Sequence, residues 1–388
     1  MKLLILACEY LPTNGGIAYA AHRFASEMRS RGMEVRVFSD LLNSTQTRQY
    51  VHEGIQVVRF AIQGDASLWK PRGGESPELL RQVNDYKPDL IVIHGWQGWP
   101  VLFLDDFRRL SIPVILQSHG FGAHKVPWQR KPPFGLRVWS GYLPFVLRLP
   151  AIIRKMRALV VLDNHPSFAR SFDHWIARKF TTTRVLTIPN GVPEITADSA
   201  AFFSEFPQLR HKKIVLCVAN YCDRKNQLFA LQVAARVADP AIHFVFIGGS
   251  SNEYLAKVMK FRQDANLQQR VHVLHSQTRA LCESAIAACQ LAMMVSKFEM
   301  QPLFLIEAMS CGKPWLSTRV GSVEELHGGV VLALGLEGFA REIVRLLADS
   351  PAATHLGAAG RSQWAAEFAP PIAFTKWQNL LLSRSGGA

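Results

Sequence analysis

The sequence lacks an apolar run long enough to cross a lipid bilayer. The best candidate among its 388 residues, Leu143–Leu162, is interrupted by four cations between Arg148 and Arg157, whereas a membrane-spanning helix needs about 20 mostly apolar residues. A shorter apolar run after Lys2 stops before Glu9, which is too short for the core of a secretory signal peptide. An integral membrane protein is therefore not expected, and the short run predicts a first buried strand.

Paired cysteines and the composition of a disordered chain are also absent. The six cysteines include no C-x-x-C pair, so the sequence predicts reduced thiols in a cytosolic protein rather than a disulfide framework or a structural zinc site. Hydrophobic residues make up 48% of the chain and charged residues 19%, a composition that excludes intrinsic disorder. The length fits two domains of about 190 residues each.

Acidic residues are missing from one long segment. Between Phe107 and Leu162 there are ten basic residues, no acidic one and several aromatic rings, within a chain whose formal net charge is +14. Such a surface can bind nucleic acid, dock on an anionic membrane with its rings among the headgroups, or form a solvated basic face. No helix-turn-helix, RRM or KH signature is visible, so no nucleic-acid partner is expected. The other two interpretations stay open.

Short aliphatic runs alternate with amphipathic stretches, which is the pattern of parallel sheets covered by helices. Two series of predicted strands are separated by the turn-rich stretch Pro189–Lys212, which we interpret as an interdomain linker. The predicted strands are Leu3–Ala7, Glu34–Phe38, Leu90–Ile93, Val114–Gln117, Leu159–Leu162 and Val185–Ile188, then Ile214–Val218, His243–Ile247, Val271–Leu274, Leu291–Val295, Pro314–Ser317 and Val330–Leu334. We predict an α/β protein with two Rossmann-like, doubly wound domains, 1–195 and 196–370, and a C-terminal helix in 371–388 that packs back on the first domain. Because ligands of such folds bind at the carboxyl ends of the strands, the domains are expected to face a central crevice.

Two loops that follow predicted strands carry features of phosphate-binding sites. Gly15 and Gly16 lie between the first strand and the first helix, where glycines let backbone N–H groups point at a phosphate. A simple tight turn explains them about as well. Arg224 and Lys225 precede a helix of the second domain, where the helix dipole disfavours cations. A bound diphosphate would remove that conflict, and solvated loop residues are the alternative interpretation.

Two glutamates flank the start of a later helix. Glu299 lies in the loop after the predicted strand Leu291–Val295, and Glu307 lies inside the helix that follows. Pro302 fits the first turn of that helix because its missing N–H costs nothing there. Both carboxylates are then placed to face the crevice, although pairs of glutamates at this spacing also arise by chance.

In chain order, these motifs resemble those of the retaining nucleotide-sugar glycosyltransferases of family 4, which have the GT-B fold. The resemblance rests on Gly15-Gly16, Ile188-Pro189-Asn190-Gly191-Val192, Arg224-Lys225-Asn226, Phe246-Ile247-Gly248-Gly249, Glu299 through Glu307 with Ala308-Met309, and Gly321 with Glu324. It is highly specific in the second domain and looser in the first.

The resemblance implies a role for each matching residue. The implied catalytic residues are Glu299 near the donor sugar, Lys225 at the donor diphosphate and His119 in contact with the donor sugar. The implied donor-binding residues are Gly15, Gly16, Asn190, Arg224, Lys225, Gln301, Leu303 and Glu307, the last of which holds the ribose hydroxyls. Many relatives carry Gly-Arg where this chain has Ala219-Asn220, so we expect Arg224 to supply the missing cation.

The expected activity is retaining transfer of a hexose from a nucleoside diphosphate sugar to a hydroxyl of a glycan or lipid-linked saccharide, in cell-envelope polysaccharide or glycolipid synthesis. The resemblance implies neither a metal nor another cofactor, because the sugar nucleotide is a co-substrate. The expected location is the cytoplasm, peripherally on the inner membrane if residues 107–162 dock there. The alternatives are another GT-B enzyme, such as a nucleotide-sugar epimerase or hydrolase, and a basic nucleic-acid-binding protein.

Overall fold

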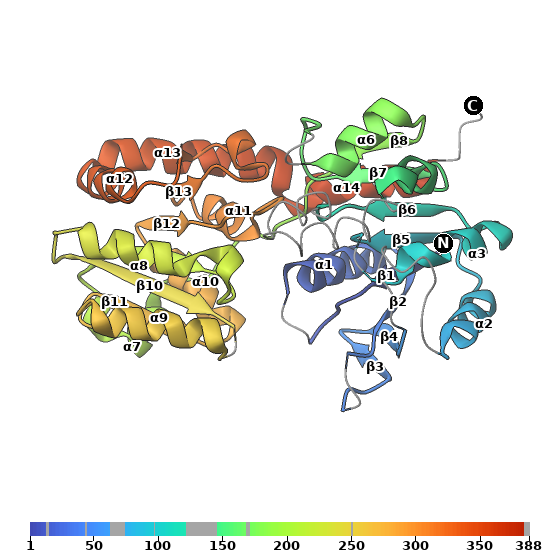
Figure 1. The fold of residues 1–388 in the computed structure, drawn as a ribbon, viewed down its shortest axis with the longest axis horizontal. Coiled ribbons are helices and arrows are strands. Elements are labelled where there is room, and N and C mark those ends of the chain that lie inside the picture. Colours follow the sequence, from blue (N-terminus) through green and yellow to red (C-terminus); the bar gives the residue numbers. More distant parts are fainter. Residues whose placement is uncertain are drawn as a thin grey trace, which may run out of the picture. The chain divides into compact units, whose positions relative to one another are not determined.

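The chain folds into two compact units, which are described separately below. The computed structural model describes residues 1–12, 15–42, 45–62, 74–96, 98–121, 146–167, 171–249 and 251–383. One unit comprises residues 1–191 with 373–388, and the other residues 192–372 (Figure 1). The chain passes from the first unit to the second after Gly191, four residues before the boundary predicted from the sequence, and returns to the first unit at Ala373.

An eight-stranded sheet forms the centre of the first unit. In sheet order its strands are β3 (Gln49–His52), β4 (Ile55–Phe60), β2 (Glu34–Asp40), β1 (Lys2–Ala7), β5 (Leu90–His94), β6 (Val114–Gln117), β7 (Ala158–Val161) and β8 (Arg184–Thr187). Among the strands that the structure describes, only the edge strand β3 runs antiparallel to its neighbour, and the other pairings are parallel. Parallel strands covered on both faces read as continuous apolar runs, which is why the sequence of β1 is almost entirely aliphatic.

Alternate residues of β1 enter two different cores. Leu4 and Leu6 pack in the core that includes residues of α2 (Ser76–Tyr86), α3 (Leu104–Arg109) and α6 (Phe172–Phe180). Leu3 and Ile5 pack on the other face, with α1 (Gly16–Ser30) and α14 (Pro370–Leu382).

Helix α14 belongs to this first unit although it ends the described chain (Figure 1). Its buried Trp377 meets Phe24 of α1 edge to face, with ring centroids 4.8 Å apart. Arg157, just before β7, donates from Nη2 to the carbonyl oxygen of Leu380 at 3.1 Å. The last helix therefore closes the core on the α1 face of the sheet.

The second unit is built on a six-stranded, wholly parallel sheet. In sheet order its strands are β11 (Val271–His275), β10 (Ile242–Gly248), β9 (Lys213–Val218), β12 (Leu291–Met294), β13 (Trp315–Thr318) and β14 (Gly329–Leu332). One core contains residues of α8 (Gln227–Arg236), α9 (Glu253–Asp264) and α12 (Leu336–Ala348), and the other contains residues of α7 (Ala200–Glu205), α10 (Arg279–Ala288) and α11 (Leu303–Ser310). Helix α13 (Ser350–Gln363) follows α12.

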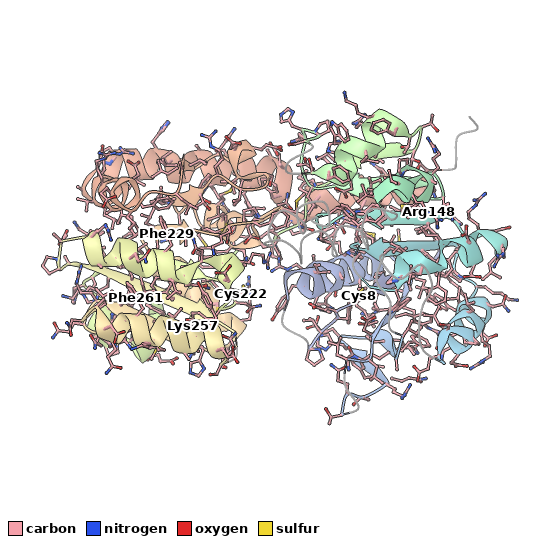
Figure 2. The ribbon with its side chains drawn as sticks, in the orientation of Figure 1. Cys8, Arg148, Cys222, Phe229, Lys257 and Phe261 are labelled. Carbon is pink, nitrogen blue, oxygen red and sulfur yellow. The ribbon has the colours of Figure 1, made fainter. Side chains whose placement is uncertain are left out.

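The helices of the second unit bury one face and expose the other. Phe229 of α8 and Phe261 of α9 pack against the core, whereas Lys257 of α9 is exposed (all three are labelled in Figure 2). Both units are thus doubly wound, Rossmann-like domains, as predicted. Within the described ranges, every helix is too short or too polar to span a bilayer, and all six cysteines are free thiols.

Two segments differ from the sequence prediction. The hairpin of β3 and β4 was not predicted, because β3 alternates exposed and half-buried residues and has no apolar face to signal a strand. The interpretation of residues 189–212 as a linker is wrong for its second half. Phe202 of α7 and the nearby Leu209 are fully buried in the core that contains residues of α10 and α11. The sequence did not reveal α7, because a six-residue helix is too short to show a helical period.

A stacked histidine pair joins β10 and β11. Nδ1 of His243 lies 3.0 Å from Nε2 of His272, and the ring centroids are 5.3 Å apart. Burial lowers the pKa of both rings, that of His272 to about 4, and the nearby cations Lys212, Arg262 and Arg270 act in the same direction. Both rings are therefore neutral in the folded protein near neutral pH.

This pair should make the second unit sensitive to acid. Above a pH of about 6.5, where free histidine titrates, the two rings are neutral in the folded and in the unfolded protein. Below this pH the unfolded chain binds protons that the folded protein resists, and for His272 this resistance extends down to about pH 4. We therefore expect the free energy of unfolding, measured by urea denaturation, to fall from pH 6.5 to pH 4. His272→Gln should show a smaller fall, and an identical pH slope in this variant would contradict the prediction.

Candidate functional site

The strand order of the second sheet reverses between β9 and β12. Successive strands run from β9 through β10 to one edge, while β12 begins the series toward the other edge. In open parallel sheets this switch point leaves room for a ligand at the carboxyl ends of the two strands. The loops that leave these two strands carry Arg224, Lys225 and Glu299, and Cys222 marks the first of them in Figure 2.

The loop after β9 is held rigidly on both sides. Arg224 and Lys225 lie in a 3-10 turn that Asn226, with φ of 58°, connects to α8; asparagine is one of the few residues that tolerate this left-handed conformation. The amide side chain of Gln227 donates to the carbonyl oxygens of Ala219 and Asn220 at 3.2 and 3.0 Å. The backbone of the loop after β12 also donates to the carbonyl oxygen of Arg224 at 2.8 Å. Both cations are therefore anchored through their backbone.

The two cations converge on one carboxylate. Nζ of Lys225 lies 2.5 Å from Oε1 of Glu299, and Nη1 of Arg224 lies 3.9 Å from Oε2. Glu299 is 7% exposed, and a carboxylate that is so buried needs a paired charge. Lys225, whose side chain is 19% exposed, supplies it, while the side chain of Arg224 is 54% exposed. Since the cluster has more positive than negative charge, it is suited to an anionic ligand.

Gly321 lets the Glu299 loop pass close to its neighbour. Its φ is +54°, and a Cβ there would clash with the carbonyl oxygens of Glu299 and Met300. The backbone N–H and the hydroxyl of Ser322 both donate to the Met300 oxygen, at 2.8 and 2.9 Å. This glycine and this serine fix the path of the loop, and therefore the position of the Glu299 carboxylate.

The second glutamate has a cation of its own. Oε1 of Glu307, which is 5% exposed on α11, accepts from Nη2 of Arg279 at 2.7 Å, and Nε of Arg279 donates to Glu283 at 2.7 Å. Burial works against the charge of Arg279, but the two carboxylates outweigh it and raise its pKa. Sequence reasoning missed Arg279. The signal was available, because a cation in the first turn of a helix, as used for Lys225, is unfavourable for the helix dipole.

The other two predicted donor-binding residues of this unit lie between the glutamates. Gln301 is buried in the loop. Leu303 begins α11 and packs against the core that contains residues of α7 and α10. Pro302 is the N-cap residue of α11, one position earlier than predicted. The structure thus brings together the predicted residues Arg224, Lys225 and Glu299 directly, and places Gln301, Leu303 and Glu307 on the segment that follows.

The remaining predicted residues belong to the first unit. His119 follows β6, and its Nε2 lies 3.3 Å from Nδ1 of His94, which ends the neighbouring strand β5. Burial lowers the pKa of His119 to about 4 and also lowers that of His94, so this stacked pair is neutral at neutral pH. Sequence reasoning missed His94. Oδ1 of Asn190 accepts from Nε2 of Gln117 at 3.2 Å.

The glycine pair opens the first helix of this unit. Gly15 is the N-cap residue of α1 and Gly16 its first residue. A Cβ on Gly15 would come within 2.6 Å of Oε2 of Glu9, so a larger residue would displace that carboxylate. Helix N-termini favour anions, and this position is therefore compatible with the predicted phosphate role.

The basic segment of residues 107–162 lies partly outside the described residues, because residues 122–145 are not described. Four of its described cations, Arg109, Arg154, Lys155 and Arg157, have partners inside the first unit, and two of these pairs are short. Nζ of Lys155 lies 2.7 Å from Oδ2 of Asp105, and Arg154 donates to the last carbonyl of α6 at 2.6 Å. These two charges serve the fold of the unit.

Two family models match the chain, one in each half. A model described as "Glycosyl transferase 4-like domain" matches residues 15–191, and one described as "Glycosyl transferases group 1" matches residues 212–349. Together they include all predicted site residues and every strand of the two sheets except β1.

Individual proteins are also similar to this chain, one in sequence and others in fold. N-acetyl-alpha-D-glucosaminyl L-malate synthase of Bacillus anthracis is 25% identical over 169 residues, which are 42% of this chain and 44% of that protein. Sucrose-phosphate synthase from Thermosynechococcus elongatus superposes with a TM-score of 0.77 at 18% identity, covering 98% of both chains. HepE of Anabaena in complex with UDP and glucose superposes with a TM-score of 0.73 at 17% identity, covering 99% of this chain and 100% of that one. This chain therefore has the GT-B fold and belongs to the GT4-type glycosyltransferases.

Proposed function

We propose that this glycosyltransferase moves a hexose from a nucleoside diphosphate sugar to a hydroxyl of a glycan or lipid-linked saccharide, with retention at the anomeric carbon. The products would serve cell-envelope polysaccharide or glycolipid synthesis. The observation that carries the proposal is the cluster of Arg224, Lys225 and Glu299 at the switch point of the second sheet. A diphosphate supplies the anion that this cluster suits, and the solved HepE structures hold UDP, UDP with glucose, or UDP-glucose.

In this mechanism the cations act on the leaving group. A bond forms between the acceptor oxygen and the anomeric carbon, while the bond from that carbon to the donor phosphate oxygen breaks. The electron pair leaves with the diphosphate, whose growing charge Lys225 and Arg224 stabilise. The acceptor proton passes to the leaving phosphate oxygen, so the step needs no separate protein base.

Donor binding would exchange the partner of Lys225. In the free protein its ammonium pairs with Glu299 at 2.5 Å, so the cation is already held at the site and loses little rotamer entropy when the diphosphate arrives. The diphosphate then competes for this ammonium. The Glu299 carboxylate would then be available to accept hydrogen bonds from hydroxyls of the donor sugar, near which the family resemblance places it.

The other predicted residues complete the proposed donor site. Arg279 orients Glu307, whose carboxylate would bind the ribose hydroxyls. His119 is neutral because burial lowers its pKa to about 4, so it would offer the donor sugar a hydrogen bond without adding a charge. The residues that complete the proposed set are Gly15, Gly16, Asn190, Gln301 and Leu303.

The proposal is tested first by a donor screen. Thermal unfolding is followed with a panel of UDP-, GDP- and ADP-sugars and the free nucleotides. A ligand at 100 times its Kd stabilises the folded state by about 2.7 kcal/mol, so we expect one nucleotide base to raise the Tm by several degrees. No shift with any sugar nucleotide would contradict the proposed donor class.

The selected donor, labelled in its sugar, is then incubated with membrane extract as the source of acceptor. Incorporation into a saccharide with the donor's anomeric configuration is expected. Donor turnover that is equally fast without extract would instead indicate an epimerase or hydrolase. A control reaction with Lys225→Ala should incorporate far less label.

A further inference from the structure

A second cluster of chemically active side chains lies in the first unit and shares no residue with the proposed donor site. It consists of His22 on α1, His52 at the end of β3, and Glu53 in the turn between β3 and β4. Nε2 of His22 lies 2.9 Å from Oε2 of Glu53, and the rings of His22 and His52 meet edge to face with centroids 4.9 Å apart. One ligand atom from each residue lies within 4.8 Å of the other two.

The hairpin delivers two of these residues to the helix. His52 pairs with Ile55, so Glu53 and Gly54 form a two-residue turn, with φ of 47° and 76°. Such turns favour glycine, asparagine or aspartate at their first position, and a glutamate there is an uncommon choice. Nη1 of Arg29, on the same helix as His22, donates to the carbonyl oxygen of Glu53 at 3.4 Å. The turn is thus held against α1 with its carboxylate at the ring of His22.

A tyrosine forms a hydrogen bond with Nδ1 of His22, the ring nitrogen that does not face Glu53. The hydroxyl of Tyr10 lies 2.9 Å from Nδ1, and burial raises the pKa of this tyrosine, so it stays a neutral phenol. When Nδ1–H donates to the Tyr10 oxygen, Nε2 carries the lone pair on the side of His52 and Glu53. Such an outer hydrogen bond is the usual way in which a metal-binding histidine is oriented. Burial also lowers the pKa of His22, and metal binding requires the neutral ring.

We propose that His22, His52 and Glu53 bind Zn²⁺ or a similar divalent transition-metal ion. Two imidazoles and one carboxylate suit Zn²⁺, and bonds of about 2.0–2.1 Å place tetrahedral ligand atoms roughly 3.4 Å apart. To reach that value from separations of up to 4.8 Å, the half-buried His52 and Glu53, whose side chain is 68% exposed, would have to rotate toward the ion. Because this side of the site is exposed, a water molecule would take the fourth coordination position of the ion.

The bound ion would act as a clip between the β3–β4 hairpin and α1. The hairpin lies at the edge of the sheet, where β3 pairs with β4 alone among the described strands. Metal bonds to His22, His52 and Glu53 would add to the contacts that already join the hairpin to α1. Metal binding should therefore stabilise this edge of the first unit against unfolding.

The test uses the full chain after removal of metal with a chelator. Co²⁺ serves as the spectroscopic probe, and Zn²⁺ competes with it. We expect one ion per chain, the visible absorption of tetrahedral Co²⁺, and a higher Tm with Zn²⁺. His52→Ala and Glu53→Gln should each reduce Zn²⁺ affinity by more than the roughly 10- to 100-fold that loss of an outer-shell partner costs. Tyr10→Phe should fall within that range.

The two ligand variants lie at the surface of the hairpin and should fold, which circular dichroism checks. His275→Ala is the matched control, because this exposed histidine lies on the second unit, and it should leave Co²⁺ binding unchanged. Absence of the Co²⁺ spectrum would overturn the proposal. Equal affinity of the wild type, His52→Ala and Glu53→Gln would overturn it as well, because the ion would then bind elsewhere.

Discussion

Replacing Lys225 with alanine is expected to lower kcat/KM for sugar transfer by about 10²- to 10³-fold, the usual effect of removing one preorganised group from a developing oxyanion. The leaving diphosphate loses its nearest cation. Glu299 then keeps only Arg224, 3.9 Å away, so its buried carboxylate repels the phosphates that Lys225 attracted. Donor affinity and the rate of sugar transfer should both fall. Initial rates over a range of donor concentrations will show this as a higher KM and a lower kcat.

Two further variants separate charge from position. Lys225→Arg keeps the charge but not the compact ammonium, so it should recover part of the lost rate. Lys257→Ala removes the same charge from the exposed face of α9 (Figure 2) and should retain full activity. Unfolding of Lys225→Ala must be measured as well, because an unpaired buried group costs about 1–3 kcal/mol. Undiminished transfer by a folded Lys225→Ala protein would refute the assignment of this residue.

The strands that are buried on both faces were predictable because their environment is uniform. A strand such as β1, buried on both faces, must be apolar along its length, so its sequence carries its position. The β3–β4 hairpin has no such signature. The outer strand β3 alternates exposed and half-buried residues. The position of the hairpin is set by the pairing of β4 with β2. Phe202 likewise finds its burial in contacts with distant parts of the chain.

The donor-site residues were predictable one by one but not as partners. Lys225 and Glu299 lie 74 positions apart, and only the reversal of strand order between β9 and β12 places their loops together. The pairing of Arg279 with Glu307 could not be predicted, because the two residues lie 28 positions apart on different helices. The His22, His52 and Glu53 cluster was invisible for the same reason, since no sequence motif links α1 to the turn of a hairpin.

Replacing Glu299 with glutamine should produce a second large effect with the opposite sign on nucleotide binding. Glutamine keeps the shape of the side chain but removes the charge that pairs with Lys225 at 2.5 Å. Both cations then face the diphosphate without competition, so the free nucleoside diphosphate should bind about 10-fold more tightly, an increase of about 1.4 kcal/mol in binding free energy. The reacting sugar loses its carboxylate partner, and kcat should fall by about 10²- to 10³-fold.

The contrast between the two variants tests whether the ion pair is exchanged on binding. If donor phosphates take Lys225 from Glu299, the residues are coupled, and the effects on nucleotide affinity should fail to add by about 0.5–3 kcal/mol in the Lys225→Ala/Glu299→Gln double variant. Calorimetric titration of the four proteins with the nucleoside diphosphate measures this coupling directly. Additive effects, or weaker nucleotide binding by Glu299→Gln, would mean that the pair stays intact in the complex. In that case the Glu299 carboxylate holds the cation in place for the diphosphate rather than yielding it.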